Sequence, residues 1–288
     1  MPTLRDIRNR VNAVRNIQQI TKAMKMVAAA RLRRAQERIL HARPYAQKME
    51  EVLRRLVCHT APELHPLLVT RNTGRTLLLL ITADKGLCGS FNSSILRLGW
   101  QFYRRETTEG REVFLMAVGR KARDFLRAKS VVPQTEYVHI FADLSYAHAS
   151  RIREEVLRLY DELNLEAVLL LYNEFKSGGQ QKIAWGRILP IEPADPASCP
   201  VPVDYLYEPS AQSVLEELLP KYLEVQIYHA LLESAAAEQA ARLAAMEMAH
   251  RNAGEMIDRL TLLYNRVRQE RITKELLEVV AGAEALRR

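Results

Sequence analysis

Apolar side chains recur at alternating steps of three and four residues along the last part of the chain. This spacing places them on one face of a helix that packs against another helix. Residues 221–288 contain no proline, and at about 1.5 Å of rise per residue they can form a rod roughly 100 Å long. Such a rod is longer than a compact domain and needs a second long helix. Its packing positions, called here the C-terminal stripe, are Leu243, Met246, His250, Ala253, Ile257, Leu260, Tyr264 and Val267.

The beginning of the chain supplies that second helix. Residues 3–43 contain neither glycine nor proline, which most disfavour a helix interior. Pro44 is a point where the helix can kink or break, but the apolar pattern beyond it predicts that the helix resumes. Several steps of three in succession predict a stripe that drifts around the helix instead of keeping a strict heptad. This N-terminal stripe comprises Leu4, Ile7, Val11, Val14, Ile17, Ile20, Met24 and Val27.

The middle of the chain has the pattern of an α/β domain. Residues 76–82 and 112–118 are continuous apolar runs, typical of buried parallel strands. A helix over 93–106, with Ser93 or Ser94 as its cap, joins them into a β-α-β unit. Together these elements predict a small domain of Rossmann-like order. The remaining expected elements are helices over 120–129 and 146–163, strands over 136–141 and 167–172, and a last strand over 180–189 that is antiparallel to its predecessor.

Prolines at 190, 193, 196, 200, 202 and 209 predict extended chain between this domain and the last helix. Ser210 is a candidate cap for that helix, and Pro220 is expected to bend its first turns, 212–219. The predicted organisation is therefore an N-terminal coiled-coil helix over 1–58, a central α/β domain over 59–209 and a C-terminal coiled-coil helix over 210–288.

Charge is concentrated at one end. Residues 1–58 carry a balance of +10, whereas the whole chain carries +8. This excess fits either an anionic partner, nucleic acid or acidic protein loops, or a solvated helix face. The three cysteines are far apart and form no CxxC pair, which predicts a reduced, intracellular protein without a disulfide scaffold. The apolar runs are shorter than a membrane helix, and no signal-peptide pattern precedes Leu4.

Candidate chemistry is sparse. The loop over 84–92 contains Gly86 and Gly89 and resembles a phosphate-binding turn, but it has neither P-loop nor dinucleotide-site spacing. A tight strand-to-helix turn is the favoured interpretation. Cys88 has no histidine marked as its base and is interpreted as a small, buried thiol. His250, on the C-terminal stripe, is interpreted as a packing histidine. The histidines show no HExxH or CxxH spacing and no carboxylate pair stands apart from ordinary helical charges, so neither a metal site nor an acid-base site is expected.

Motifs at both ends and in the middle resemble the gamma subunit of F-type ATP synthases, in order and over essentially the whole chain. The resemblance implies a long antiparallel coiled coil of N- and C-terminal helices, with the central Rossmann-like α/β domain as its foot. The motifs are Leu4–Arg8, Gln19–Ala29, Ile81–Gly89, Asp204–Pro209, Glu238–Met246, Leu260–Gln269 and Ile272–Glu275.

The resemblance also implies a function. Proteins of this family are non-catalytic rotor shafts that turn inside a ring of three alpha and three beta subunits. Their foot rests on the membrane c ring beside epsilon, and proton-driven rotation changes the nucleotide affinities of the beta sites. The expected location is the cytoplasmic face of a bacterial plasma membrane, as a peripheral subunit, because no transit peptide is found. The basic first helix would then face acidic protein.

Individual residues receive roles by the same resemblance. Contacts with beta are expected from Lys22, Met24 and Lys25, which would lie near an acidic region, and from Arg268 and Gln269, which would hydrogen-bond a beta loop. The last apolar stripe enters an apolar bearing, pairs with the first helix, or does both on different faces; its residues are Leu276, Val279, Val280, Ala283 and Leu286. At the foot, Tyr205, Tyr207 and Glu208 are expected to contact the c ring.

The chain departs from the family pattern at a few positions. Met248 replaces an expected asparagine, Leu263 replaces a serine, and Glu270 with Arg271 replaces two small residues. These changes bear on the local fit to beta. The loop sequence Ala-Asp-Lys-Gly beginning at Ala83 replaces the common Ser-Asp-Arg-Gly.

Two other classes of protein remain open. A basic coiled coil that binds nucleic acid predicts steeply salt-dependent binding to DNA or RNA, although the second helix is near neutral. A Rossmann-type enzyme with helical arms predicts nucleotide binding by the isolated chain, although the phosphate fingerprint is missing. Assembly with alpha and beta subunits distinguishes the rotor from both.

Overall fold

The computed structural model describes residues 3–58, 65–176, 181–191 and 210–285. Its internal contacts divide the chain into two compact units. Unit 1 comprises Met1–Ala28 and Leu243–Arg288, and unit 2 comprises Ala29–Arg242. Two long helices contribute to both units: α1 spans Leu4–Cys58 and α5 spans Ala211–Ala285. The three-part domain division expected from the sequence stays a prediction.

Both long helices pass through a proline. Helix α1 has 55 residues and includes Pro44, so it resumes beyond that residue as predicted. Helix α5 has 75 residues and includes Pro220. At the start of α5, the Ser210 hydroxyl accepts the backbone N–H of Ser213 at 3.2 Å, which confirms Ser210 as a cap. At the start of α1, the Thr3 hydroxyl likewise accepts the N–H of Asp6 at 3.2 Å.

Unit 2 is built on a five-stranded sheet in the order β3-β2-β1-β4-β5. Strand β1 pairs in parallel with both β2 and β4, and β2 pairs in parallel with β3. Strand β5 runs antiparallel to β4, as predicted. This is the Rossmann-like order expected from the sequence. The strands span Arg75–Ile81 (β1), Glu112–Val118 (β2), Thr135–Tyr137 (β3), Ala167–Phe175 (β4) and Gln181–Leu189 (β5).

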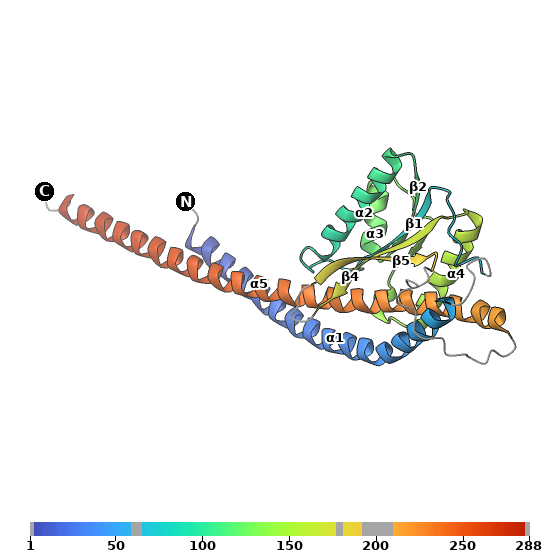
Figure 1. Ribbon diagram of the computed structural model, residues 1–288. Coiled ribbons are helices and arrows are strands. Elements are labelled where there is room, and N and C mark those ends of the chain that lie inside the picture. The colour runs from blue at the N-terminus through green and yellow to red at the C-terminus, as the bar shows by residue number, and fades with distance from the viewer. Residues whose placement is uncertain (1–2, 59–64, 177–180, 192–209, 286–288) are drawn as a thin grey trace. The chain divides into compact units, whose positions relative to one another are not determined.

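Alternate residues of β1 serve opposite faces of this sheet, since side chains of a strand alternate between its two sides. Leu78 and Leu80 belong to one apolar cluster with residues of α2, Phe91–Thr108, and α3, Arg120–Ala128. The other face carries α4, Tyr146–Glu162, together with the parts of α1 and α5 that belong to unit 2. Figure 1 shows these two helical layers on either side of the sheet.

Two local predictions are wrong. The strand expected over 136–141 ends at Tyr137 and is followed by a 3-10 turn, Ile140–Ala142, because His139 adopts a left-handed conformation with φ +64° that extended chain cannot include. Helix α2 begins at Phe91, with Ser90 at the cap position, instead of at Ser93 or Ser94. The Ser93 hydroxyl instead donates to the Ser90 carbonyl from inside the first turn.

Candidate functional site

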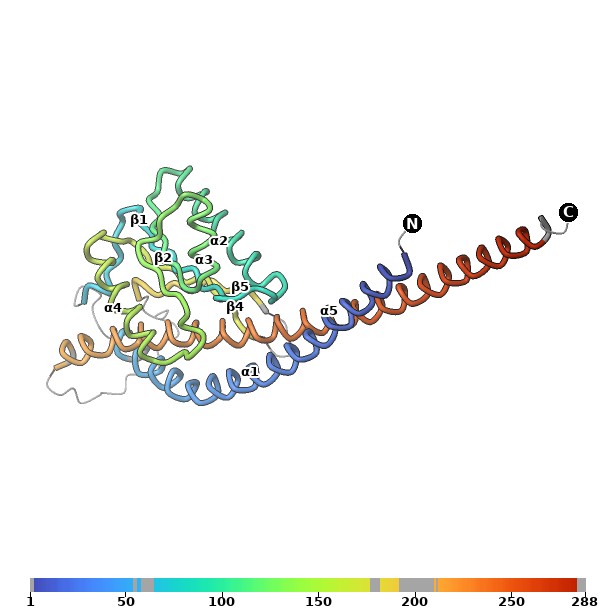
Figure 2. The backbone as a smooth tube through the Cα atoms, turned by 180° about the vertical axis from the view of Figure 1, so that it is seen from behind, coloured from blue at the N-terminus to red at the C-terminus, as the bar shows by residue number. Residues whose placement is uncertain are grey.

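Unit 1 is an antiparallel pair of helices. Gln18 of α1 contacts His250 of α5, whereas Lys25, later in α1, pairs with Glu247, earlier in α5. In both views the two helices run side by side here, and α5 continues past the start of α1 (Figures 1 and 2). Every residue of the C-terminal stripe is buried or half-buried, whereas the residues between them from Glu255 to Arg266 are exposed. The C-terminal stripe is therefore confirmed.

The N-terminal stripe is partly wrong. Ile17, Ile20 and Val27 are 52%, 58% and 51% exposed, so they do not face α5. Their places are taken by Gln18, Thr21 and Ala28, which restore a strict alternation of three and four. Polar residues such as Gln18 and Thr21 hold packing positions on α1, so the apolar residues alone give a drift that the packed face does not have. The less exposed positions of α1 in unit 1 are Leu4, Ile7, Val11, Val14, Gln18, Thr21, Met24, Lys25 and Ala28.

The polar positions of this interface are satisfied within it. Nδ1 of His250 lies 3.1 Å from the carbonyl oxygen of Gln18, and the Thr21 hydroxyl donates to the same oxygen at 3.0 Å. Gly254 of α5 faces the Gln18 side chain, and a Cβ at position 254 would lie 3.2 Å from the side-chain nitrogen Nε2 of Gln18. His250 therefore has a partner inside the helix pair, in agreement with its interpretation as a packing histidine.

The expected beta-contact residues of α1 differ in their surroundings. Lys25 forms an ion pair with Glu247, in which each side chain is 40% exposed. The hydrogen bond from Lys25 in this ion pair holds the pKa of the Glu247 carboxyl below its usual range. Lys22 is exposed, and within the described residues no ion pair is found for it. Met24 is half-buried. Sequence reasoning missed the Lys25–Glu247 pair, because it joins residues more than 200 positions apart.

Arg268 and Gln269 lie on α5 just beyond the C-terminal stripe and are exposed. Ion pairs within α5 flank them: Arg266 Nε lies 3.0 Å from Glu270, and Arg271 Nε lies 2.8 Å from Glu275. Glu270 and Arg271, the residues that depart from the family pattern, thus have partners on their own helix. For the Arg268 guanidinium, no ion pair occurs among the described side chains.

The C-terminal end of α5 carries apolar side chains that are exposed to solvent in unit 1. Leu276, Val279 and Val280 are 61%, 69% and 57% exposed, and Ala283 is exposed as well. Pairing with α1 therefore does not cover these four residues. Leu286 lies outside the described residues, as do the expected foot contacts Tyr205, Tyr207 and Glu208. Met248 and Leu263, two departures from the family pattern, are also exposed.

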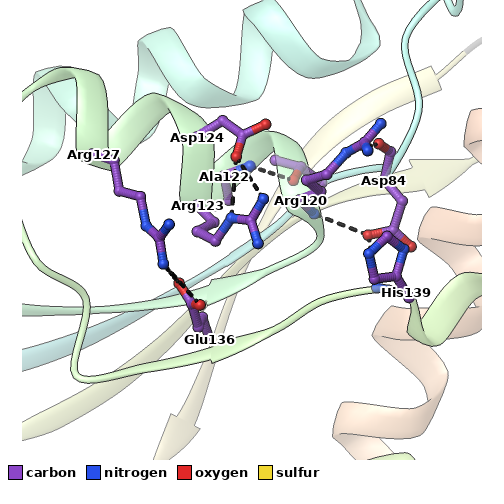
Figure 3. Close-up of polar contacts among 9 residues, drawn as sticks. Asp84, Arg120, Ala122, Arg123, Asp124, Arg127, Glu136 and His139 are labelled. Carbon is purple, nitrogen blue, oxygen red and sulfur yellow. Dashed lines mark hydrogen bonds and ion pairs between the residues drawn. The ribbon is translucent and has the colours of Figure 1, made fainter.

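The loop after β1 is an internally bonded turn in unit 2. The Asp84 carboxylate accepts the backbone N–H groups of Arg120, at 2.9 Å, and His139, at 3.0 Å. Figure 3 shows this carboxylate between the start of α3 and the chain that follows β3. The Asn92 side chain accepts the N–H of Ala83 at 2.9 Å and donates to the Lys85 carbonyl. These bonds agree with a tight strand-to-helix turn.

The crevice where a Rossmann-like sheet binds nucleotides is filled by side chains in this protein. In such sheets ligands bind beyond the carboxyl ends of the strands, where the strand order reverses. Here that point lies between β1 and β4, and Ala83, Cys88, Phe91 and Ala237 form a buried apolar cluster beside it. Ala237 comes from α5, so the long helix occupies the position a dinucleotide would need.

A hydrogen bond from Arg242 also ties the loop after β1 to α5, and an ion pair within α5 holds the same arginine. Arg242 donates to the Gly86 carbonyl at 3.1 Å and pairs with Glu238 at 2.6 Å. Burial raises the pKa of Glu238, and Arg242 opposes that rise. Burial also raises the pKa of the Cys88 thiol, which disfavours the reactive thiolate. The loop thus positions α5 on the sheet.

The described residues show neither a metal-binding group nor a membrane span. No three His, Cys, Asp or Glu side chains of these residues come together as metal ligands do. None of their helices combines the length and apolarity needed to cross a membrane.

Comparison with known proteins gives a consistent result over the full length. A family model described as ATP synthase matches residues 3–286. A relative named ATP synthase gamma chain, from Anaeromyxobacter sp. (strain Fw109-5), is 46% identical, and the match covers 100% of both chains. Another of the same name, from Heliobacterium modesticaldum (strain ATCC 51547 / Ice1), is also 46% identical, with 99% of this chain and 100% of the relative covered.

Solved structures resemble the chain as well. A chain from the central stalk and c ring of the Tetrahymena thermophila mitochondrial ATP synthase gives a TM-score of 0.59 at 30% identity, covering 80% of this chain and 99% of that one. A chain from the Euglena gracilis mitochondrial ATP synthase gives a TM-score of 0.71 at 20% identity, covering 98% and 94%. At 20% identity, the similarity to the Euglena gracilis chain shows a shared fold only.

Proposed function

The chain belongs to the ATP synthase gamma-chain family, and from this premise we propose that it is the central rotor shaft of a proton-translocating F-type ATP synthase. It couples rotation of the membrane c ring to conformational changes of the catalytic beta subunits during ATP synthesis. Its partners are three alpha and three beta subunits, the epsilon subunit and the c ring. The shaft itself carries out no catalysis and needs no cofactor. It sits as a peripheral subunit at the cytoplasmic face of a bacterial plasma membrane.

The observation that carries this proposal is the exposed apolar end of α5. Beyond Val267 every described side chain from Arg268 to Ala283 is exposed, and apolar residues such as Leu276 and Val279 are among them. Contiguous exposed apolar surface marks a place where a partner binds. An apolar sleeve formed by the alpha and beta subunits would cover this end and let it turn, since apolar contacts lack directional bonds.

The exposed surface of α1 supports the same role. Ile17, Ile20 and Val27 face away from α5, and the cationic Lys22 is exposed in the same stretch. A helix pair with different chemistry on each side presents a different surface to each of the three beta subunits at any rotation angle. Such a shaft binds three equivalent sites unequally, and unequal binding shifts them toward different conformations.

The remaining contacts assigned to beta are Met24, Lys25, Arg268 and Gln269. The guanidinium of Arg268 and the amide of Gln269 can donate hydrogen bonds to carboxylate or carbonyl oxygens of a beta loop. Leu276, Val279, Val280, Ala283 and Leu286 form the bearing tip, and Tyr205, Tyr207 and Glu208 contact the c ring. The functional boundaries we propose are 1–58, 59–209 and 210–288.

Reconstitution tests the proposal directly. The full chain is mixed with purified alpha and beta subunits, and the product is analysed for stoichiometry, ATPase activity and rotation of a bead attached to unit 2. We expect one chain for three alpha and three beta subunits, and unidirectional rotation driven by ATP. Failure to form a complex of this stoichiometry would refute the rotor function.

Coupling to the membrane needs a second experiment. The reconstituted enzyme with its membrane sector is placed in liposomes, and ATP-driven acidification is recorded with a pH-sensitive dye. A variant with Leu276→Ser and Val279→Ser serves as the bearing test, and Met248→Ser, an exposed apolar residue elsewhere on α5, is the matched control. Normal proton pumping by the double variant would remove the tip from the mechanism.

Binding to nucleic acid is the alternative, suggested only by the basic N-terminal helix. It predicts an affinity for duplex DNA that falls steeply with salt. Tight DNA binding combined with failure to assemble with alpha and beta would favour this alternative over the rotor.

A further inference from the structure

A cavity of about 350 Å³ lies within unit 2, and its lining residues Asp84 and Glu238 directly follow Ala83 and Ala237 of the cluster that fills the crevice of the sheet. Its walls come from α1, the loop after β1, the 3-10 turn after β3 with the chain that follows it, and α5. The size falls within the range of roughly 300–1,000 Å³ typical of small-molecule sites. None of the residues assigned to the rotor function lines it.

One side of this cavity is cationic. Arg31 and Arg34 of α1 and Lys85 of the loop after β1 line it, and within the described residues no ion pair is found for any of the three. Arg38 also lines it and donates to the Leu144 carbonyl at 3.2 Å. Unpaired guanidinium and ammonium groups that converge on a cavity favour a phosphate or carboxylate there.

The two acidic residues of the lining, Asp84 and Glu238, offset only part of this positive charge. Both Asp84 hydrogen bonds go to backbone N–H groups, those of Arg120 and His139. Glu238 is held by Arg242, at 2.6 Å. The lining contains four cationic side chains, those of Arg31, Arg34, Arg38 and Lys85, against these two carboxylates, so the cavity keeps a surplus of positive charge.

The opposite side is apolar and contains one polar atom without a partner. Phe141, Leu144 and Leu232 supply the apolar wall. Oε1 of Gln239, a lining residue, is buried and has no hydrogen-bond partner. This oxygen is covered by protein atoms, so it is not offered to a ligand in the cavity.

We propose that this cavity binds a compact organic phosphate of the nucleoside diphosphate class. The phosphates lie on Arg31, Arg34 and Lys85, and the planar apolar part lies on the wall of Phe141 and Leu144. The site is separate from the catalytic sites of the complex, because all of its residues belong to this chain.

The test uses the full chain by itself, so that nucleotide sites of other subunits do not contribute. Titration calorimetry with ADP, inorganic pyrophosphate and adenosine is carried out at about 0.15 M salt, where weak surface electrostatics are screened. We expect saturable binding of one ADP, weaker binding of pyrophosphate, and the weakest binding for adenosine. Equal affinities for ADP and pyrophosphate, or no saturable binding of ADP, would overturn the proposal.

A pair of variants locates the site. Arg34→Gln together with Lys85→Gln removes two exposed cations and should weaken ADP binding at least about tenfold, because each charge-assisted hydrogen bond contributes that much. Arg33→Gln is the matched control: it lies beside Arg34 on α1 but pairs with Glu37 and is absent from the lining. Circular dichroism checks that both variants fold. Binding that survives in the double variant places ADP elsewhere and defeats the proposal.

Failure of the cavity proposal can be distinguished from failure of the rotor function. Assembly with alpha and beta tests the rotor and does not require the cavity, whereas ADP binding by the isolated chain tests the cavity and does not require assembly. Arg34 lies on α1, so its substitution would not affect a nucleotide in the crevice of the sheet. The single variant Arg34→Gln therefore also separates this site from Rossmann-type binding, which Lys85→Gln does not, because Lys85 belongs to the loop after β1.

Discussion

Nδ1 of His250 lies 3.1 Å from the backbone carbonyl oxygen of Gln18, and this contact joins the two helices of unit 1. A carbonyl oxygen only accepts, so Nδ1 carries the hydrogen in this contact. The same oxygen also accepts the hydroxyl of Thr21, which lies three residues further along α1. A polar contact of this kind defines one register of the helix pair, because a shift of either helix leaves buried polar groups without partners.

Replacement of His250 by alanine should weaken unit 1 locally. Loss of a hydrogen bond of this type costs about 0.5–1.5 kcal/mol, which corresponds to a rise of roughly two- to thirteenfold in amide exchange from local opening. Hydrogen exchange of amides around Met246 and Ala253 measures the effect. Met248→Ala, at an exposed position two residues away, is the control and should leave exchange unchanged. Unaltered protection in His250→Ala would show that the contact contributes nothing to the pairing.

The fold was largely predictable because its strongest signals are local. The continuous apolar run from Leu77 to Ile81 fixes a buried strand, and the alternation from Leu243 to Val267 fixes the face that α5 packs with. These signals need only the chain's own periodicity. The predicted ends of elements were wrong where the backbone conformation of a single residue ends an element. His139 is an example, because its positive φ prevents the extended chain of β3 from continuing.

The candidate site was less predictable, because its contacts are tertiary. The sequence shows that Lys25 is basic, but only the folded helix pair brings it to Glu247. It shows Ile17 and Ile20 at helical spacing, but both face away from α5 because Gln18 and Thr21 hold the packing positions. Testing a strict heptad with polar residues allowed would have found this. The cavity lined by Arg31, Arg34 and Lys85 cannot be recognised from the sequence, because its walls come from segments that are far apart along the chain.

Gly119 is expected to be among the least replaceable residues of unit 2. It adopts φ +94°, and a Cβ at this position would lie 2.2 Å from the Thr82 carbonyl oxygen. Gly119→Ala therefore combines backbone strain with a clash against main chain and should cost about 3–5 kcal/mol. Urea unfolding followed by tryptophan fluorescence measures it, because both tryptophans, Trp100 and Trp185, lie in unit 2.

Gly110→Ala is the matched control for this substitution. Gly110 also has a positive φ, +79°, but nothing lies within 4 Å of the Cβ it would gain. Only the strain remains, and the expected cost is about 1 kcal/mol. Equal destabilisation by the two variants would mean that the approach of Gly119 to Thr82 is relieved at little cost.

Arg268→Ala together with Gln269→Ala should reduce rotation-coupled ATPase in the reconstituted complex while leaving the chain folded. Both residues are exposed on α5 and unnecessary for the pairing with α1. A loss of about tenfold is expected, equivalent to about 1.4 kcal/mol of lost interaction with beta. Arg259→Ala is the control, because Arg259 is an exposed arginine of the same helix, 83% exposed at its side chain. Unchanged ATPase in the double variant would remove both residues from the contact with beta.

Cys88 should react slowly with alkylating reagents, and only at high pH. Burial raises the pKa of its thiol, so the thiolate, the reacting form, appears at higher pH than for a free cysteine. A chain with Cys58→Ala and Cys199→Ala isolates its reaction. Iodoacetamide labelling followed by mass spectrometry should show a rate that keeps rising above pH 9 and increases strongly in urea, where burial is lost. Rapid labelling at pH 7 in the folded chain would contradict this.

Lys22 and Lys25 should contribute unequally to assembly with beta, although both are basic and only three positions apart. Lys25 is engaged by Glu247, whereas Lys22 is exposed and has no ion pair among the described residues. A cation that is already paired gains less from a second carboxylate, since the attraction of its neighbour offsets part of its charge. Lys22→Gln should therefore weaken assembly several-fold at low salt, with the difference shrinking as salt screens the contact, and Lys25→Gln should weaken it less. Surface plasmon resonance on alpha–beta assemblies over a salt series measures both. A larger effect of Lys25→Gln would show that Glu247 releases this lysine to beta on assembly, and that the in-chain pair does not limit its role.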